Sequence, residues 1–417
     1  MTTATSPGRP PAAERQRPDT VEAAARYLRA GAGDRRGVLI TGAGTKLGWG
    51  GPVTAPMVEL DTSRLDQIID YRPSDMTVAV QAGTPLNTLQ GVLAEHGQWL
   101  AIDPPTEAAG ATVGGLLATG DAGPCRLRYG TLRDLAIGCT VVLADGVVAH
   151  AGGHVIKNVA GYDLTKLMHG SLGTLALIGE VVLRLQPVPE ATRTISCRLS
   201  AVAAVWATLA VIGSGVEPSA TEWYGAGSGP GVLLVRLDGT QRSIEPAAAV
   251  VLQQLREVNA VDLQILTVDD AVEQWRRAAE TTTGGGRCHP AADGAATVRL
   301  GTLPDQLPLV VEQLDTLGSR HQVRFELTSS TGIGLHTVRL TGPVASLAAL
   351  IDDLGAVLQR QLGGTLTLRD RDRDVDQLRG TSAPMPDPPP TAGLQRAVKD
   401  HFDPGHRLAP GRFAPWF

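Results

Sequence analysis

Residues 37–48 read GVLITGAGTKLG, an apolar, β-rich stretch that leads directly into a loop of closely spaced glycines. Glycine has no Cβ and can adopt positive φ, so consecutive backbone N–H groups of such a loop can turn toward one anion. Lys46 adds a positive charge beside them. The segment is typical of a loop that holds a phosphate, and an ordinary turn is the open alternative.

Two familiar nucleotide-binding motifs do not fit this loop. Asp61 lies about where a ribose-binding acid would stand in a dinucleotide fold, but the glycine spacing is one residue off and residues 49–52 cannot open a helix. No glycine stands five residues before a Gly-Lys-Ser/Thr sequence, as a P-loop requires. The sequence therefore excludes both a Rossmann fold and a P-loop.

A second glycine-rich segment reads PPTEAAGATVGGLLATGDAG over residues 104–123 and is followed by RLRYG at 126–130. Gly114 and Gly115 stand where a short helix can begin, and the N–H groups of a helix N-terminus can face an anion. The alternative is that these glycines only allow two elements to pack closely.

The third segment reads IKNVAGYDL over residues 156–164 and continues as GSLGT at 170–174. Asp163 is predicted to cap the helix that follows it. Lys157 and Tyr162, between glycine-flanked turns, can direct a hydrogen-bond donor at a ring or a carboxylate, although each fits a solvated surface group as well.

Hydrophobic periodicity predicts an α+β chain whose first domain covers residues 19–189. It begins with a helix capped at Asp19, and the residues before it, 1–18, are predicted to be a disordered leader without the apolar core of a signal peptide. The prolines at 187 and 189 mark the end of this domain, because tandem prolines interrupt a strand ladder. Its predicted strands are 37–41, 57–61, 77–81, 137–143, 147–151 and 176–185, with helices at 85–96 and 164–169.

A second domain is predicted over residues 190–379, where one pattern of strand, helix, two strands, helix and strand occurs twice. Such a pattern favours helices packed on one face of an antiparallel sheet. The proline-dense residues 380–391 read as a linker. Residues 392–417 are predicted to form a last helix and a tail whose apolar end, Phe413, Trp416 and Phe417, docks onto the protein.

Composition excludes several classes of protein. The 417 residues carry a formal charge of −5 with 43% hydrophobic and 19% charged residues, which are ordinary globular values and give no sign of a nucleic-acid partner. The four cysteines are scattered without metal-ligand spacing, so no metal site is expected and a reduced, cytoplasmic setting fits. The most apolar runs are interrupted by charges, so no membrane span is predicted, and membrane contact would come through partners.

Taken in order, the three glycine segments resemble the FAD-binding domain of the vanillyl-alcohol-oxidase type, also called PCMH-type FAD-linked oxidases. The match is closest over residues 157–164 with 170–175, and it is particularly similar to the FAD-binding subunits of bacterial glycolate oxidases. The tail sequences FDP at 402–404 and PGR at 410–412 extend the resemblance to the C-terminus. It implies two α+β subdomains that hold FAD, a ferredoxin-like cap domain, and a C-terminal segment that returns to the FAD domain.

The resemblance also implies the cofactor-binding residues. The first loop would line the FAD pyrophosphate, the second segment would form a second cradle, residues 123–130 would lie near the flavin, and the third segment near the adenine end. The implied set is Gly42, Gly44, Thr45, Lys46, Gly48, Pro104, Thr112, Gly114, Gly115, Ala118, Gly123, Tyr129, Gly130, Gly173 and Ile178.

Three departures from the family pattern matter. The first loop has no histidine where covalently flavinylated relatives carry one, so a non-covalent FAD is expected. Gly120-Asp121 replaces an Asn-containing turn, and Ala409 replaces the Asn of the usual Asn-Pro-Gly tail. Related 2-hydroxy-acid dehydrogenases carry an H-x-G-D-G-N-x-H-like metal motif, whereas here the nearest stretch, residues 330–336, has only His336, which we interpret as structural.

The expected function is therefore that of an FAD-binding subunit in a complex that oxidises glycolate or another small 2-hydroxy acid. A larger FAD-linked dehydrogenase subunit would carry the missing motif, and an iron–sulfur subunit would take the electrons onward. Lys157, Tyr162 and Arg128 are the candidate polar groups near the flavin. The alternatives are a self-sufficient oxidoreductase with Tyr162, His289 or His336 as its base, and a non-catalytic assembly protein with a degenerate pocket.

Overall fold

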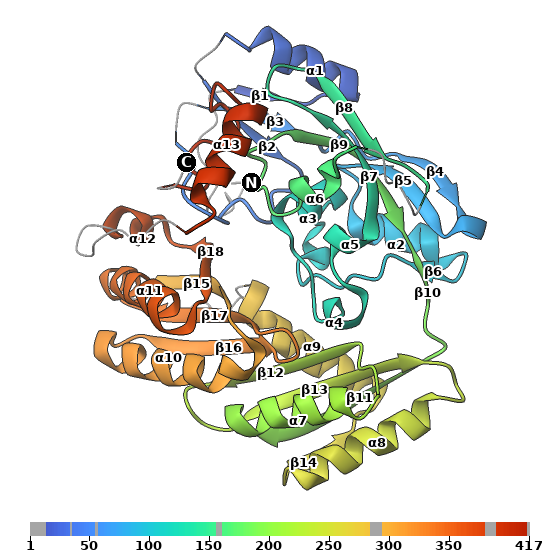
Figure 1. Cartoon of the computed structure of the whole chain (residues 1–417), viewed down its shortest axis with the longest axis vertical. Helices are drawn as coiled ribbons and strands as arrows, with labels where there is room; N and C mark the ends of the chain where they lie inside the picture. The colour runs from blue at the N-terminus through green and yellow to red at the C-terminus, as the bar shows by residue number, and fades with distance from the viewer. Residues whose placement is uncertain are drawn as a thin grey trace, which may run out of the picture. The chain divides into compact units, whose positions relative to one another are not determined.

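The computed structural model describes residues 14–33, 36–54, 57–155, 161–283, 294–379 and 389–414. The chain divides into two compact units (Figure 1). The first unit runs to Gly123, resumes over Tyr129–Val188 and ends with the C-terminal segment from Asp387. The second comprises Pro124–Arg128 and Pro189–Pro386, so a short insertion from the predicted first domain belongs to it.

A three-stranded parallel sheet opens the first unit, in the order β1-β3-β2. Its strands are β1 (Glu14–Gln16), β2 (Gly37–Thr41) and β3 (Met57–Asp61). The predicted leader is thus too long, because Arg15 and Arg17 pair with the buried Asp61 at 2.6 and 2.9 Å and hold β1 beside β3. Helix α1 (Val21–Ala30) is capped by Thr20 and not by Asp19, since Thr20 Oγ1 accepts from Ala23 N–H.

The second sheet of this unit has five antiparallel strands in the order β4-β5-β9-β7-β8. Leucines of the helices pack against it, because α2 and α3 each turn an apolar face to the strands and form one buried cluster with them. The strands are β4 (Ile68–Arg72), β5 (Thr77–Gln81), β7 (Ala136–Val142), β8 (Val148–Gly152) and β9 (Leu177–Arg184), with helices α2 (Leu86–Ala94), α3 (Val113–Thr119), α5 (Leu132–Leu135) and α6 (Leu164–Met168). A short strand β6 (Gln98–Trp99) pairs with β10 (Gln186–Pro187). Helix α4 (Arg126–Tyr129) lies, except for its last residue, in the insertion that belongs to the second unit.

Helix α13 (Ala392–Phe402) and the tail after it join the first unit through polar contacts. The buried Lys399 Nζ donates to Thr174 O at 2.7 Å and to Leu408 O at 3.0 Å, and it pairs with Asp403 at 2.6 Å. The tail then runs beside β2, where Val38 N–H donates to Arg407 O. Docking therefore combines these buried charges with apolar packing of Val398, Phe402 and Leu408. Of the three predicted apolar anchors, Trp416 and Phe417 lie outside the described residues.

The second unit contains two β-α-β-β-α-β repeats that share one eight-stranded antiparallel sheet, in the order β14-β11-β13-β12-β16-β17-β15-β18. The repeats join where β12 pairs with β16. Each repeat has the ferredoxin-like strand order, which confirms the α+β fold class expected from the sequence. The first repeat is β11 (Ala191–Leu199), α7 (Ala201–Gly213), β12 (Ala220–Ala226), β13 (Gly231–Gly239), α8 (Ile244–Glu257) and β14 (Val261–Ile265); the second is β15 (Gly294–Gly301), α10 (Leu307–His321), β16 (Arg324–Ser330), β17 (Leu335–Gly342), α11 (Val344–Val357) and β18 (Thr365–Arg371).

Both faces of this sheet carry helices. Helices α7, α8, α10 and α11 lie on one face (Figure 1). Their apolar residues are buried there together with Trp223 and Phe325 of the strands. Helix α9 (Val268–Thr283) lies on the opposite face, where Thr328 Oγ1 donates to Ala278 O and Trp275 Nε1 donates to Thr194 Oγ1. A short helix α12 (Arg373–Leu378) follows the last strand.

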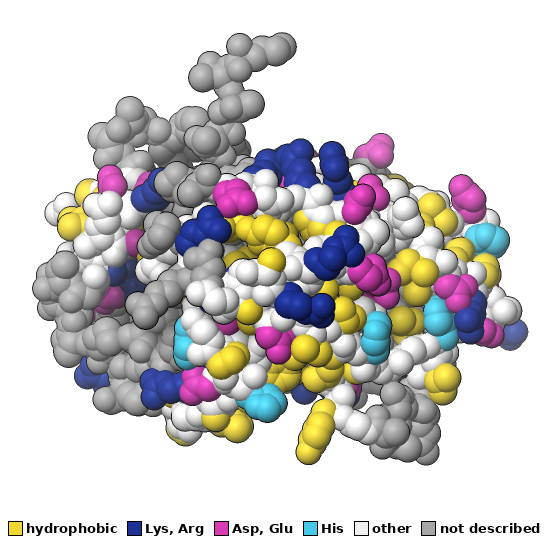
Figure 2. Space-filling view, turned by 90° about the horizontal axis from the view of Figure 1, so that it is seen from above, with side chains coloured by type: hydrophobic (Ala, Val, Ile, Leu, Met, Phe, Trp, Pro, Cys, Tyr) yellow, Lys and Arg dark blue, Asp and Glu magenta, His cyan; other side chains and the backbone are white. Residues whose placement is uncertain are grey.

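Charges of both signs are mixed on the face of the molecule that Figure 2 shows. In the face seen in Figure 2, Lys and Arg side chains lie among Asp and Glu side chains with hydrophobic groups between them. Within the described ranges, none of the helices has the length and apolar character needed to cross a membrane.

Candidate functional site

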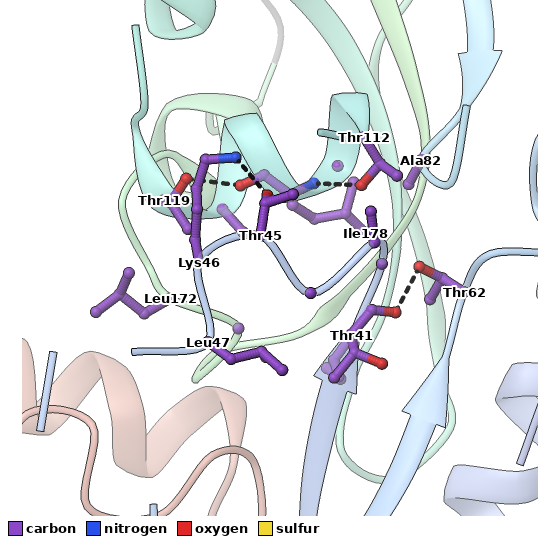
Figure 3. A pocket seen from close by; sticks show the side chains of 18 of the residues that line it. Thr41, Thr45, Lys46, Leu47, Thr62, Ala82, Thr112, Thr119, Leu172 and Ile178 are labelled. Atoms are coloured by element: carbon purple, nitrogen blue, oxygen red, sulfur yellow. Dashed lines mark hydrogen bonds between the residues drawn. The ribbon is translucent and has the colours of Figure 1, made fainter. Parts of the chain in front are cut away.

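A hollow of about 740 Å³, including its open mouth, lies in the first unit where the three glycine segments meet (Figure 3). The loop after β2, helix α3 and the segment before β9 supply most of its wall. Its lining residues are Leu39, Ile40, Thr41, Gly42, Ala43, Gly44, Thr45, Lys46, Leu47, Trp49, Thr62, Ala82, Thr112, Gly114, Gly115, Ala118, Thr119, Leu172, Gly173, Ala176, Ile178 and Arg412. Ten of the fifteen implied cofactor-binding residues are among them.

The first loop offers backbone donors to this hollow. Gly44 has φ +76°, a left-handed conformation that glycine adopts without steric cost. The N–H groups of Ala43, Gly44 and Thr45 make no hydrogen bond to any part of the chain that the structure describes. A Cβ at Gly42 would lie 2.4 Å from Thr112 Oγ1, so glycine lets the loop approach α3. Three consecutive donors therefore remain for an anionic ligand.

Lys46 brings a buried positive charge to the same loop (Figure 3). Its Nζ donates to Thr45 Oγ1 at 3.0 Å and lies 3.7 Å from Asp121 Oδ2. Asp121 is fixed in turn by Thr106, whose Oγ1 donates to the same carboxylate oxygen at 2.8 Å. The carboxylate thus holds the ammonium group at the wall of the hollow.

Helix α3 borders the hollow but offers it no free backbone N–H donors at its N-terminus. Its first N–H groups are already used, because Val113 donates to Thr84 O, Gly114 to Ala82 O and Gly115 to Thr112 Oγ1. A Cβ at Gly114 would lie 2.6 Å from the Cβ of Ala82, so close packing explains this glycine. A Cβ at Gly115 would meet only Thr112 Oγ1, at 3.0 Å. The interpretation of the α3 N-terminus as an anion site is therefore wrong, although Gly115 still borders the hollow.

The third segment closes the hollow with an apolar surface. Leu172 and Gly173 have φ of +53° and +72°, a strained conformation for the leucine. Ala176, Ile178 and Ile40 also line the hollow. A lining that combines amide donors and a buried lysine with aliphatic side chains fits a diphosphate joined to an aromatic ring.

Five of the implied cofactor residues do not line the hollow. Gly48 and Pro104 lie outside its lining. Gly123 is required by packing, since a Cβ there would lie 1.8 Å from Asp103 O. Gly130 adopts φ +78° beside Asp134, and the Tyr129 ring packs edge-on against Trp99 at 5.5 Å. Their role at a flavin stays a prediction.

Of the candidate catalytic residues, the two that the structure describes, Arg128 and Tyr162, do not line the hollow. Lys157 lies outside the described residues. Arg128 belongs to the second unit, where its Nη1 donates to Asp238 O at 2.7 Å. Tyr162 is 94% exposed and lines a different hollow, while its neighbour Asp163 caps α6 as predicted by accepting from Lys166 N–H.

The two histidines considered as bases differ in what the structure says of them. His289 lies outside the described residues. His336 is fully buried, with hydroxyl partners on both ring nitrogens, Ser329 Oγ and Thr302 Oγ1, each at 2.9 Å. Burial lowers the pKa of His336 from 6.5 to about 4, so the ring is neutral at pH 7. Its interpretation as a structural histidine agrees with this environment.

Arg412 is a lining residue that the cofactor-binding prediction did not include. It is buried, and its Nη1 donates to Trp49 O at 2.7 Å and to Gly51 O at 3.3 Å, which ties the tail to the first glycine loop. The PGR sequence at 410–412 extends the family resemblance to the C-terminal tail, but the sequence alone does not show that this tail reaches the first glycine loop.

Comparison with known proteins shows what this chain is similar to. Residues 15–152 match the FAD binding domain family. The chain is 36% identical to glycolate oxidase subunit GlcE of Escherichia coli over 167 residues, covering 40% of this chain and 47% of that protein. It is 25% identical to glycolate oxidase subunit GlcD of Bacillus subtilis over 401 residues, covering 90% of this chain and 83% of that one.

Two further relatives complete the comparison. A probable mitochondrial D-lactate dehydrogenase of Danio rerio is 34% identical over 190 residues, covering 45% of this chain and 38% of that protein. The chain thus spans less than half the length of two of these curated relatives. A solved structure of alkyldihydroxyacetonephosphate synthase shares the fold with a TM-score of 0.72 at 15% identity, covering 95% of this chain and 76% of that one.

The chain therefore carries an FAD binding domain over residues 15–152, and it is similar to proteins named as oxidases and dehydrogenases. FAD is its cofactor. The residues of the hollow fit FAD, because the unbonded amides of the first loop and the buried Lys46 line the same hollow of this domain.

Proposed function

We propose that this chain is the FAD-binding subunit of a complex that oxidises a small 2-hydroxy acid, such as glycolate, to the 2-oxo acid. The observation that carries the proposal is the hollow in the FAD binding domain, with three consecutive unbonded amides and a buried lysine. The names of the relatives, glycolate oxidase subunits and D-lactate dehydrogenases, support the substrate class.

Within this proposal the chain binds and orients the cofactor. The amides of Ala43, Gly44 and Thr45 hold the diphosphate, and Lys46 balances part of its negative charge. Ile40, Ala176 and Ile178 are the aliphatic lining residues that would exclude water from a bound ring. FAD, when bound, supplies the group that accepts the hydride from the hydroxy acid. The FAD is non-covalent, because residues 42–49 contain no histidine for a covalent link.

Partner subunits complete the reaction in this proposal. Oxidation of a hydroxy acid also needs a base for the hydroxyl proton and a cation for the carboxylate. Among the residues that the structure describes, no group of three or more His, Cys, Asp and Glu side chains could hold a metal ion, and His336 is buried and neutral. A larger FAD-linked dehydrogenase subunit would supply these groups, and an iron–sulfur subunit would carry electrons onward. The complex would be cytoplasmic or attached to a membrane through those partners.

The test is anaerobic bleaching of the flavin by glycolate and by D-lactate. We expect the FAD-loaded chain alone to bleach little, and the chain purified with its partner subunits to bleach on mixing with substrate. Complete bleaching of the chain alone would instead establish a self-sufficient oxidoreductase. A chain that takes up no FAD would favour the non-catalytic assembly protein.

A further inference from the structure

We propose that a second hollow in the first unit binds a small monoanionic carboxylate through Arg133 and Arg184. This hollow, about 890 Å³ with its open mouth, lies between α5, α6, the end of β8 and the last residue of β9, and it shares no lining residue with the FAD hollow. The inference goes beyond the proposed function, because it concerns direct binding at a separate place and requires no turnover.

The proposal depends mainly on Arg184. It ends β9, the central strand of the five-stranded sheet, and its Nε is buried without a hydrogen-bond partner anywhere in the described chain. Removing a charged N–H from water without a partner is costly, and such groups in native proteins usually meet a water or an ion. A ligand in the hollow that Arg184 lines would supply the missing acceptor.

Arg133 places a second guanidinium on the same hollow. The backbone of α5 is fixed by a capping box, in which Thr131 Oγ1 accepts from Arg133 N–H and Asp134 Oδ2 accepts from Thr131 N–H. The Arg133 side chain is exposed and forms no ion pair with the described residues. It therefore stands on a rigid turn with its charge available.

The charges around the hollow select the ligand. Lys166 is neutralised by Asp163 at 3.0 Å, and Asp134 is the remaining acid of the lining. Two arginines against one carboxylate leave one net positive charge, which suits a monoanion better than a dianion. The planar guanidinium fork also matches the two oxygens of a carboxylate. The hollow is thus suited to an anion such as acetate or glycolate.

The test is calorimetric titration of the full FAD-loaded chain with acetate, glycolate and inorganic phosphate. We expect saturable binding of the carboxylates, weaker binding of phosphate, and a loss of at least about tenfold in carboxylate affinity for Arg184→Met and for Arg133→Met. Arg64→Met, at an exposed arginine of the same unit, is the matched control and should bind like the parent chain.

The free energy of unfolding of the Arg184→Met variant distinguishes a ligand-binding role of this arginine from a structural one. Because the Arg184 guanidinium has an unpartnered buried N–H, Arg184→Met should leave the ligand-free chain as stable as the parent or more stable in urea unfolding. Should that variant fail to fold, the exposed Arg133→Met still tests binding. Carboxylate affinity unchanged in the arginine variants, no carboxylate binding at all, or tighter binding of phosphate would each overturn the proposal.

Discussion

The charge of Lys46 is the residue-scale feature that most directly connects this chain to a diphosphate. Its ammonium group is buried, 3.7 Å from the buried Asp121, and lies on the same loop as the unbonded amides. A buried cation is rarely kept without a partner or a ligand, because desolvation disfavours the charge. Here Asp121 holds the lysine in place, and the cofactor gives the lysine a function.

We predict that Lys46→Met weakens FAD binding by at least about tenfold, since a charge-assisted contact to the diphosphate is lost. It also destabilises the chain, because Asp121 is left as a buried charge without its ion pair. The double variant Lys46→Met/Asp121→Asn separates the two effects. It should recover much of the free energy of unfolding in urea but none of the FAD affinity, and recovery of both would contradict the assignment.

A second prediction concerns how the free energy of unfolding depends on pH through His336. Burial lowers its pKa from 6.5 to about 4. Between these two pH values the histidine is protonated in the unfolded chain and neutral in the folded chain. Stability from this group is full above pH 6.5 and falls as the pH drops toward 4, by about 3 kcal/mol in all. His336→Gln should show a flatter urea-unfolding profile between pH 7.5 and 4.5, and an equally steep profile would exclude His336 as the cause.

At the scale of elements, α13 is held by buried ionic contacts. Lys399 satisfies the carbonyls of Thr174 and Leu408 and the carboxylate of Asp403, which itself accepts from the N–H groups of Arg407 and Leu408. Burial lowers the pKa of Lys399, and the pairing with Asp403 opposes that change. The helix is therefore attached by a network that is centred on the Lys399–Asp403 pair.

We predict that Lys399→Met costs about 3–5 kcal/mol of unfolding free energy, the usual cost of removing one partner of a buried pair. Lys166→Met is the matched control. Lys166 also pairs with an aspartate, at 3.0 Å, but the pair is about half exposed, so its loss should cost less than about 1 kcal/mol. Equal losses in thermal or urea unfolding would show that the α13 network is not what stabilises the tail.

The sequence predicted the elements with a clear hydrophobic pattern and missed those without one. Both ferredoxin-like repeats follow from alternating strands such as β13 and apolar-faced helices such as α10. Helix α9 was missed because it is largely polar, although its Ala, Glu, Gln and Arg content favours a helix. Strand β1 was missed because its three residues are polar and are held by ion pairs with Asp61 and Glu59 from β3.

The candidate site shows the same limit of sequence reasoning. Glycine spacing identified Gly42, Gly44 and Gly115 as lining residues. Gly114 and Gly115 both line the hollow, but glycine spacing could not show that Gly114 is required by its packing against Ala82 while Gly115 is not, because both stand at the start of one helix. Nor could it place Arg412, which reaches the first loop from more than 350 positions away, as its bonds to Trp49 and Gly51 show.

For the whole molecule, the chain returns to its first unit after completing the second. We predict that a chain ending at residue 386 loses FAD, because it lacks Lys399 and also Arg412, which holds the carbonyls of Trp49 and Gly51 beside the glycine loop. Flavin absorbance after gel filtration measures this. Retention of FAD at the full-length level by the shortened chain would show that the tail is dispensable for the site.

The most direct test of the central claim, that FAD occupies the hollow of the first unit, is titration of FAD into three chains followed by flavin absorbance and denaturation. The parent chain should bind FAD and release it on denaturation. Gly115→Leu should lose at least about tenfold in affinity, because its side chain enters the hollow, whereas Gly91→Leu, at an open glycine of α2, should bind normally. Equal FAD affinity in all three chains, or flavin that stays attached after denaturation, would contradict the account.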